Sequence, residues 1–417
     1  MRILVVTQYF PPDMGAPAGR FFDFAKHWTA QGFEVVVVTG MPHFPGGTIH
    51  EGYRSRVFLR EERAGAEVHR CWTFTSKRRG FGSGLAYATF LLSSSLYLLF
   101  GRLRYDVVIG TSPPPSVGLP ALLGAWRRRV PFVLDIRDIW PEAIVQSGRL
   151  TNPLLIRVFE GLVRFLYRRA TRISAVTEGW RLRLIEMGVP GEKVAVLPNG
   201  VDVAAFDRDA AGALPEAFAA LEADANWFVY AGILNSPQGL EIILEAAALM
   251  REGQPAFYAC SQFVIVGEGP READLRESAR KQGLDRVVFV PRQDRSAVFA
   301  LLRQSYAVLV TLRPRKDIST VPSKLYESMA SGRPVLYSAA GEGAATLERA
   351  GGGIVCEPGN AEALEAAMTE LLRDPEAAKR GGEAARRFVA QHYDRAQIAA
   401  DFGAVLEQAC HPEPEAH

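Results

Sequence analysis

The sequence contains few cysteines, and their positions argue against two classes of protein. The 417 residues include only Cys71, Cys260, Cys356 and Cys410. No two of them have the spacing of a CxxC pair, and no Cys/His cluster has the spacing of a zinc site. This distribution argues against a disulfide framework and a structural metal. We predict reduced thiols in a cytoplasmic protein.

The sequence also lacks a strong charge of either sign and a long hydrophobic run. The formal net charge is only +2, so no global attraction to nucleic acid is expected. The apolar run at residues 3–6 is too short for the core of a signal peptide, and we predict a buried strand there. The uncharged segment at residues 85–100 is shorter than the ~20 apolar residues that span a bilayer.

Short apolar runs alternate with stretches of helical spacing, which predicts parallel sheets covered on both faces. One set of runs lies at residues 3–6, 35–38, 107–109 and 132–134. A second set lies at residues 227–231, 263–266, 287–290, 308–310 and 335–337. The fold class we predict is α/β, with two Rossmann-like doubly wound domains facing each other across a cleft. Their ranges are 1–200 and 201–385, and a final helix at 386–417 either caps the second domain or crosses back to the first.

The loop after the first run is rich in proline and glycine. Gly15 and Gly19 precede a predicted helix at residues 21–30. Ligands of parallel sheets bind at the carboxyl ends of strands, where glycine allows close approach and a helix N-terminus attracts anions. An ordinary surface connection explains the same residues, and the spacing is not GxGxxG.

Several segments together resemble the retaining glycosyltransferases of family 4, which have the two-domain GT-B fold. They read YFPP at residues 9–12, NGVD at 199–202, YAG at 230–232, VIVGEGP at 264–270 and VPSKLYESMASGRPV at 321–335. Their order and spacing carry the resemblance, which covers nearly the whole chain. Residues 135–142, DIRDIWPE, combined with the PSK triplet, are similar to WbuB-like amino-sugar transferases of surface polysaccharide assembly.

The resemblance implies that the first domain binds the acceptor and the second binds a nucleotide-sugar. It implies that the donor phosphate accepts the acceptor proton, so that no protein nucleophile is needed. For the reacting centre we predict Arg137, Asp138 and Glu142. The donor contacts that we predict are Gly15, Gln238, Gly267, Arg292, Ser323, Lys324, Leu325 and Glu327. Glu327 is expected to accept the ribose hydroxyls, and no metal or other cofactor is expected.

The charge of Lys324 and the helix position of Ser323 and Lys324 support their assignment as donor contacts. Ser323 and Lys324 fall in the first turn of a predicted helix, whose N–H groups bind a diphosphate well. A lysine at that positive helix end is unfavourable unless an anion is present. A solvated lysine, a surface Glu327 and a structural Arg137–Asp138 pair are the alternative interpretations.

The sequence departs from the family pattern at three positions. Many members carry an arginine and a lysine at the positions of Ile233 and Gln238, and a glutamate at that of Ser319. Arg313, Arg315, Lys316 and Lys324 are candidates to replace the missing positive charge. The missing carboxylate leaves the identity of the donor sugar open.

Residues 85–100 are flanked by basic residues on both sides, Lys77, Arg78 and Arg79 before and Arg102 and Arg104 after. They form either a buried helix or a helix that lies in a membrane surface with cationic anchors. The arginines at residues 157–172 fit a membrane surface and a solvated helix face equally well.

We therefore predict a retaining glycosyltransferase that moves a sugar, an N-acetylated amino sugar in our interpretation, from a UDP-linked donor to a lipid-linked or glycan acceptor. Its expected partners are the nucleotide-sugar, the acceptor and the inner face of the cell membrane, contacted through residues 77–104, and not nucleic acid. The alternatives are a nucleotide-sugar epimerase of related fold and a non-catalytic member of a polysaccharide assembly complex.

Overall fold

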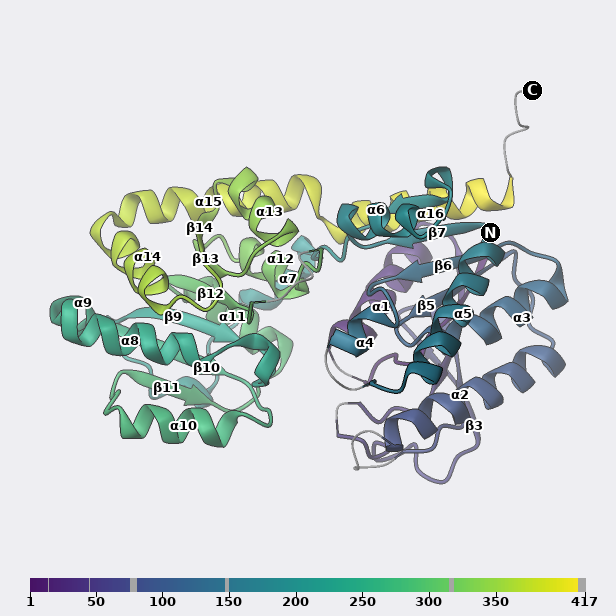
Figure 1. Cartoon of the computed structure of the whole chain (residues 1–417), viewed down its shortest axis with the longest axis horizontal. Helices are drawn as coiled ribbons and strands as arrows, with labels where there is room; N and C mark the ends of the chain where they lie inside the picture. The colour runs from purple at the N-terminus through teal and green to yellow at the C-terminus, as the bar shows by residue number, and fades with distance from the viewer. Residues whose placement is uncertain (14, 45, 76–80, 147–149, 315–318, 412–417) are drawn as a thin grey trace. The chain divides into compact units, whose positions relative to one another are not determined.

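A computed structural model describes residues 1–13, 15–44, 46–75, 81–146, 150–314 and 319–411. The chain forms two compact units, each built around one sheet (Figure 1). Unit 1 consists of Met1–Asn199 together with the chain from Arg395 onward, and unit 2 consists of Gly200–Asp394. This architecture confirms the predicted α/β class with two parallel-sheet domains.

The sheet of unit 1 has eight strands in the order β3-β4-β2-β1-β5-β6-β7-β8. All neighbouring pairs are parallel except β3 and β4, which form an antiparallel pair at one edge. The strands are β1 Arg2–Val6, β2 Glu34–Gly40, β3 Phe58–Arg63, β4 Ala66–Cys71, β5 Val107–Ser112, β6 Phe132–Ile136, β7 Arg172–Ala175 and β8 Val194–Val196.

Helices cover both faces of this sheet. The helices α1 and α16 pack on one face, and α2, α3, α5 and α6 pack on the other. Their bounds, with those of the short α4, are α1 Ala16–Ala30, α2 Phe81–Phe100, α3 Gly118–Arg128, α4 Glu142–Gln146, α5 Pro153–Arg169, α6 Glu178–Glu186 and α16 Arg395–Cys410.

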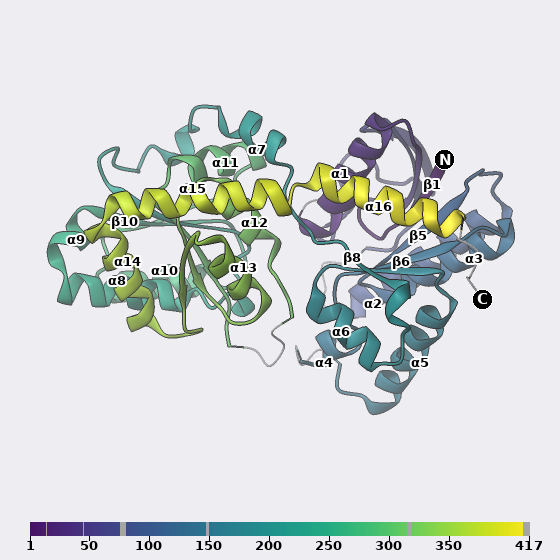
Figure 2. The same ribbon diagram turned by 90° about the horizontal axis from the view of Figure 1, so that it is seen from above.

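The last helix returns to unit 1 and lies beside α1 (Figure 2). The indole of Trp28 donates a hydrogen bond to the carbonyl of Ala399 at 2.8 Å, and Phe402 packs edge-on against Phe24. At the start of α16, Arg395 donates to the carbonyl of Asn199 at 3.0 Å and pairs with Asp23. These contacts show why the segment belongs to unit 1, a point that the sequence left open.

The sheet of unit 2 has six parallel strands in the order β11-β10-β9-β12-β13-β14. The strands are β9 Asn226–Ala231, β10 Ser261–Val266, β11 Val287–Val290, β12 Ala307–Thr311, β13 Val335–Ser338 and β14 Gly353–Cys356. Each of the five runs predicted for the second domain forms one of these strands, whereas β14 was not predicted.

The helices of unit 2 also form two layers. One face of the sheet is covered by α7, α11, α12, α13 and α15, and the other by α8, α9, α10 and α14. Their bounds are α7 Val203–Ala210, α8 Glu241–Gly253, α9 Pro255–Ala259, α10 Glu272–Lys281, α11 Arg295–Gln304, α12 Ser323–Ala330, α13 Glu342–Ala350, α14 Ala361–Arg373 and α15 Pro375–His392.

The uncharged segment of the sequence forms most of α2, and this helix is buried on one side only. Phe90, Ser94 and Leu98 face the core, whereas Leu92, Leu96 and Phe100 are exposed. In the described part of the chain, we find no helix with the length and apolarity needed to cross a bilayer. The basic residues Lys77, Arg78 and Arg79 lie outside the described residues.

Candidate active site

The predicted donor contacts of unit 2 lie where its parallel strands end. Gln238 follows β9, Gly267 follows β10, and Arg292 follows β11. Ser323, Lys324 and Glu327 lie on α12, the helix that follows β12. Because β11, β10, β9 and β12 are neighbours in one parallel sheet, these segments meet at the same edge.

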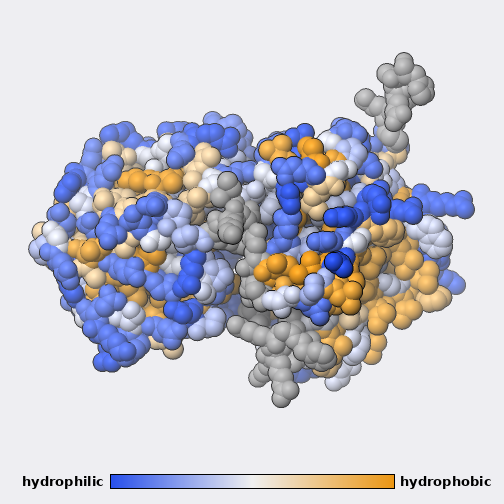
Figure 3. Space-filling model, viewed as in Figure 1, coloured by the Kyte–Doolittle hydropathy of each residue, from blue (hydrophilic) through white to orange (hydrophobic). Residues whose placement is uncertain are grey.

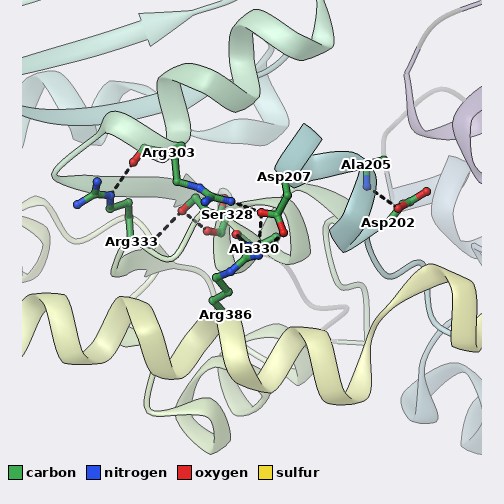
Figure 4. Close-up of polar contacts among 9 residues, drawn as sticks. Asp202, Ala205, Asp207, Arg303, Ser328, Ala330, Arg333 and Arg386 are labelled. Carbon is green, nitrogen blue, oxygen red and sulfur yellow. Dashed lines mark hydrogen bonds and ion pairs between the residues drawn. The ribbon is translucent and has the colours of Figure 1, made fainter. Parts of the chain in front are cut away.

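The helix α12 is fixed at its C-terminal end by a cluster of charged side chains (Figure 4). Arg386 of α15 donates a hydrogen bond to the carbonyl of Ala330, one of the acceptors that a helix end leaves free. Asp207 of α7 accepts from Arg386 at 2.5 and 2.7 Å and from Arg303 of α11 at 2.5 Å. The cluster therefore ties three neighbouring helices to the end of α12.

At the other end of α12, the amine of Lys324 lies between two oxygen atoms. Its Nζ donates to the hydroxyl of Tyr230 at 2.8 Å and to Oε1 of Gln238 at 2.6 Å. The amine also lies 4.1 Å from the centre of the Tyr230 ring, within the range of a cation–π contact. Burial lowers the pKa of Lys324 to about 7, and the nearby Glu327 carboxylate opposes this shift.

Two glycines allow the turns around this amine to approach closely. A Cβ at Gly232, where φ is 156°, would lie 2.8 Å from the Nζ of Lys324. A Cβ at Gly267 would lie 1.9 Å from the carbonyl oxygen of Gly232. The backbone clash makes glycine necessary at Gly267, which brings the turn after β10 against the turn after β9, whereas at Gly232 the positive φ favours glycine and a Cβ would displace the amine.

Glu327 and Arg292 are half-buried and take part in charge pairs. A carboxylate oxygen of Glu327 lies 3.8 Å from a guanidinium nitrogen of Arg295, a long contact that leaves the carboxylate able to accept further hydrogen bonds. Arg292 donates to Glu268 at 3.0 Å. The structure thus places one loosely held carboxylate and one paired guanidinium at this edge.

The side chain of Leu325, another predicted donor contact, is fully buried in the core of unit 2. Its N–H donates to the carbonyl of Pro322 at 3.0 Å. The side chain of Leu325 therefore anchors α12 to the sheet, and its contact with the donor stays a prediction. Of the candidate replacement cations, Arg313 donates to Glu241 at 2.9 Å, and Arg315 and Lys316 lie outside the described residues.

In unit 1, Arg137 and Asp138 follow directly after β6. The N–H of Arg137 donates to the carbonyl of Ser112 at 3.0 Å, and its guanidinium reaches the carbonyl of Pro113 at 3.4 Å. Burial lowers the pKa of Arg137, and the Asp135, Asp138 and Tyr9 side chains oppose this shift. The two predicted residues are half-buried and share one charged environment at the carboxyl end of the sheet.

Glu142 and Gly15, the other two predicted residues of unit 1, make contacts with other parts of the unit. Glu142 begins α4 and accepts a hydrogen bond from Arg183 of α6 at 2.5 Å, so its charge is already paired. Gly15 is the N-cap of α1 with φ of 87°, and its carbonyl accepts from the N–H groups of Ala18 and Gly19. The helix thus begins five residues before the predicted start at residue 21, so Gly15 lies at its N-terminus and Gly19 lies inside it; the donor contact of Gly15 stays a prediction.

Sequence comparisons assign both units to known domain families. Residues 15–200 match the sequence profile of the glycosyl transferase 4-like domain, and residues 216–388 match that of the glycosyl transferases group 1. The putative colanic acid biosynthesis glycosyl transferase WcaI of Escherichia coli is 28% identical over 417 residues, 96% of this chain and 98% of that protein. The chain belongs to the GT4 glycosyltransferases.

Further relatives are consistent with this family. The O-antigen chain mannosyltransferase C of Escherichia coli is 30% identical over 173 residues, 40% of this chain and 44% of that protein. The solved structure of Anabaena Alr3699/HepE in complex with UDP matches with a TM-score of 0.70 and 18% identity, covering 98% of this chain and 100% of that one. The fold is therefore GT-B, and the family assignment favours the transferase over the epimerase and the non-catalytic partner.

For a GT4 glycosyltransferase, the structure adds residues that sequence reasoning did not assign to the site. Tyr230 was noted only as part of the YAG motif, yet its hydroxyl contacts Lys324. In unit 1, one carboxylate oxygen of Asp13 accepts from the N–H groups of His43 and Phe44, both at 2.7 Å. Only the place of Tyr230, just before a glycine turn, gave a signal that was visible in the sequence.

Within the described ranges, no three histidine, cysteine, aspartate or glutamate side chains are grouped closely enough to hold a metal ion. Metal independence of this glycosyltransferase stays a prediction.

Proposed function

We propose that this glycosyltransferase transfers an N-acetylated amino sugar from a UDP-linked donor, with retention of configuration, to a lipid-linked acceptor in surface polysaccharide or glycoconjugate assembly. The observation that carries the proposal is the arrangement on α12, where Lys324 lies in the first turn and Glu327 in the second. One cation and one carboxylate on consecutive turns of the same helix suit a nucleoside diphosphate, the cation for the phosphates and the carboxylate for the ribose.

The donor diphosphate is assigned to Lys324 and the N-terminal turn of α12. Helix N-termini bind phosphate because their N–H groups are free and the helix dipole is positive there. Glu327 is assigned to the ribose, since an ionised carboxylate accepts hydrogen bonds from two hydroxyls. Support for UDP comes from the relative Alr3699/HepE, which was solved with UDP bound. The amino sugar rests on the resemblance to WbuB-like transferases alone.

The reaction requires that donor and acceptor are held in position and that the leaving diphosphate is stabilised. In a retaining transfer of this kind, the donor phosphate oxygen accepts the proton of the attacking hydroxyl, so no protein nucleophile is required. Preorganised charges supply most of the rate in such reactions. We assign the growing charge on the diphosphate to Lys324, and the acceptor hydroxyl to Arg137 and Asp138 of unit 1.

A lipid-linked acceptor is supported by the exposed face of α2. Leu92, Leu96 and Phe100 lie on this face, and Phe100 is 74% exposed. Trp72 and Phe74, which follow β4, are exposed near the same helix, because Ser93 donates to the carbonyl of Trp72 at 2.7 Å. A surface of large apolar side chains on an otherwise folded unit is typical of an interaction site.

Basic residues surround apolar side chains on the neighbouring helices of the same layer. Trp126 of α3 is 73% exposed and is followed by three arginines, and Leu154 of α5 is 68% exposed. Figure 3 shows apolar side chains gathered over α5 and α2. Apolar side chains combined with arginines suit an anionic lipid surface, which supports peripheral attachment at the inner face of the cell membrane.

The test is a panel of UDP- and GDP-linked sugars, assayed by thermal shift and by donor hydrolysis with the purified chain. We expect a UDP-linked N-acetylhexosamine to raise the melting temperature most and to be hydrolysed slowly without acceptor. Addition of a polyprenyl-linked acceptor should accelerate release of UDP. A larger effect of GDP-sugars would overturn the UDP assignment, and no effect of any nucleotide-sugar would overturn the proposed function.

A further inference from the structure

The amine of Lys324 is held only by uncharged groups. Its two hydrogen-bond acceptors are the phenol oxygen of Tyr230 and the amide oxygen of Gln238. No carboxylate oxygen of the described residues lies within 4.0 Å of the amine, so no described residue neutralises it through an ion pair. An isolated ammonium inside a protein is unfavourable unless an anion accompanies it.

The two acceptors are fixed in position by the sheet. Tyr230 is a fully buried residue of β9, and its hydroxyl also contacts the carbonyl of Ile233 at 3.1 Å. The carbonyl of Gln238 accepts a hydrogen bond from Thr311 of β12 at 2.7 Å, which ties the turn after β9 to the next strand. Both acceptors therefore belong to rigid elements and can hold a flexible lysine side chain in one place.

An ammonium group has three N–H donors, and two of them are used by this pair of acceptors. Gly232 leaves the space beside the amine without a side chain, since a Cβ there would lie 2.8 Å from Nζ. One donor and the whole positive charge are thus available to a ligand at the N-terminus of α12.

We propose that Tyr230 and Gln238 are positioning residues, which hold the Lys324 amine for the donor diphosphate without neutralising its charge. This inference rests on the proposed function, because it takes a nucleoside diphosphate as the ligand. Gln238 occupies a position where many family members carry a cation, and here it orients a cation supplied by α12. The sequence showed the missing charge, whereas the structure assigns the glutamine a role.

The arrangement couples donor binding to the uptake of a proton by the Lys324 amine. Because burial lowers the pKa of Lys324 to about 7, a part of the free protein carries a neutral amine at neutral pH. A diphosphate stabilises the ammonium, so its binding raises the pKa and the amine takes up a proton from solvent. At neutral pH the wild-type chain should therefore take up a fraction of a proton for each UDP bound, because part of the free amines are neutral there.

Two substitutions of Gln238 test the inference because they should change the number of protons taken up per UDP in opposite directions. In Gln238→Met the amine loses an acceptor that favours its charged form, so proton uptake at pH 7 should rise toward one per UDP. In Gln238→Glu the new carboxylate keeps the amine charged in the free protein, so uptake should fall close to zero. Both variants should bind UDP roughly tenfold more weakly, the first through a misplaced amine and the second through charge repulsion.

The measurement is isothermal titration calorimetry of the full chain with UDP in buffers of different ionisation enthalpy, which counts the protons taken up. Tyr230→Phe keeps the ring and removes the acceptor oxygen, and it should behave like Gln238→Met. Gln397→Met on the exposed side of α16 is the matched control and should equal the wild type. Circular dichroism melting of each variant confirms that it is folded.

Equal proton uptake in the wild type and both Gln238 variants would overturn the inference while leaving the proposed function intact. A wild-type chain that binds UDP with no proton uptake between pH 6 and pH 9 would also overturn it. If the wild type bound no nucleoside diphosphate at all, the proposed function would fail together with the inference.

Discussion

The guanidinium of Arg20 and the carboxylate of Asp135 form an ion pair at 3.0 Å in which both side chains are almost completely buried. Arg20 lies on α1, and Asp135 lies on β6. The same guanidinium donates to the carbonyls of Leu197 at 2.8 Å and Pro198 at 2.6 Å. Arg20 therefore joins the opening helix and a central strand to the segment that leads into unit 2.

Arg20→Ala should lower the stability of unit 1 strongly. Removal of one partner from a buried pair leaves an uncompensated charge and costs about 3–5 kcal/mol. Urea denaturation followed by fluorescence should show an earlier transition for unit 1, with UDP binding by unit 2 retained. Arg280→Ala, which removes an exposed pair with Glu277, should leave the transition unchanged. A transition for Arg20→Ala equal to that of the wild type would contradict this role.

Glu327→Gln should weaken binding of the donor nucleotide. If the carboxylate accepts the ribose hydroxyls, replacing it with an amide loses hydrogen bonds to a charged group, worth about 1.5–3 kcal/mol. The dissociation constant for UDP should therefore rise by roughly ten- to a hundredfold. Glu277→Gln on the exposed side of α10 is the matched control. Unchanged affinity and turnover in Glu327→Gln would remove this residue from the donor site.

Lys324→Ala should lower kcat more than it raises the KM for donor. Negative charge on the leaving diphosphate grows toward the transition state, so the lost interaction is stronger there than in the ground state. The wild-type affinity for UDP should fall as the pH rises above about 7, because only the protonated amine attracts the diphosphate. Lys324→Ala should lose this pH dependence. A variant with normal kcat would place the cation elsewhere, with Arg137 the next candidate.

Asp207→Asn tests whether the charged cluster at the end of α12 acts on the site. Asp207 binds both Arg386 and Arg303, and Arg386 holds the carbonyl of Ala330 (Figure 4). We expect a loss of about 1–2 kcal/mol in the stability of unit 2, since the pair is partly exposed to solvent. The KM for donor should rise while kcat changes little. A change in kcat alone would mean that the cluster affects the chemistry rather than the position of α12.

The sequence predicted most of the fold because buried parallel strands leave a strong local pattern. Every apolar run that we assigned to a strand forms one, namely β1, β2, β5, β6 and β9 to β13, whereas the short strands β7 and β8 were not predicted. The hairpin of β3 and β4 was missed, because residues 58–63 (FLREER) lie at a sheet edge and contain only two apolar residues, followed by four charged ones. The strand β14, with glycine at its first position, gave too short an apolar run.

The candidate site was predicted less completely, since motifs fix positions along the chain and not contacts. The motif at residues 321–335 placed Lys324 and Glu327 on one helix, but it did not show that the side chain of Leu325 packs in the core. The hydrogen bonds from Lys324 to Tyr230 and Gln238 join residues 94 and 86 positions apart. Spacing along a single sequence carries no information about such contacts.

The last prediction is that the chain binds anionic liposomes through the α2 face of unit 1. A polyprenyl acceptor is too apolar to leave a bilayer, so the enzyme must reach it at the membrane surface. The exposed side chains of α2 supply apolar contact, and each basic residue close to an anionic surface adds ~1 kcal/mol. Sedimentation with anionic vesicles should therefore pellet the protein at low salt and release part of it at high salt.

Leu92→Ser combined with Leu96→Ser should reduce this binding without loss of UDP affinity, because both side chains are exposed and lie in unit 1. Leu182→Ser, an exposed position on α6, is the matched control and should pellet like the wild type. Replacing Lys77, Arg78 and Arg79 with Ser should weaken the salt-sensitive part alone, since electrostatic attraction is screened by ions whereas apolar contact is not. If the wild type stayed in the supernatant at low salt, the outer face of α2 would not be a membrane surface. A water-soluble acceptor would then replace the lipid-linked one in the proposal.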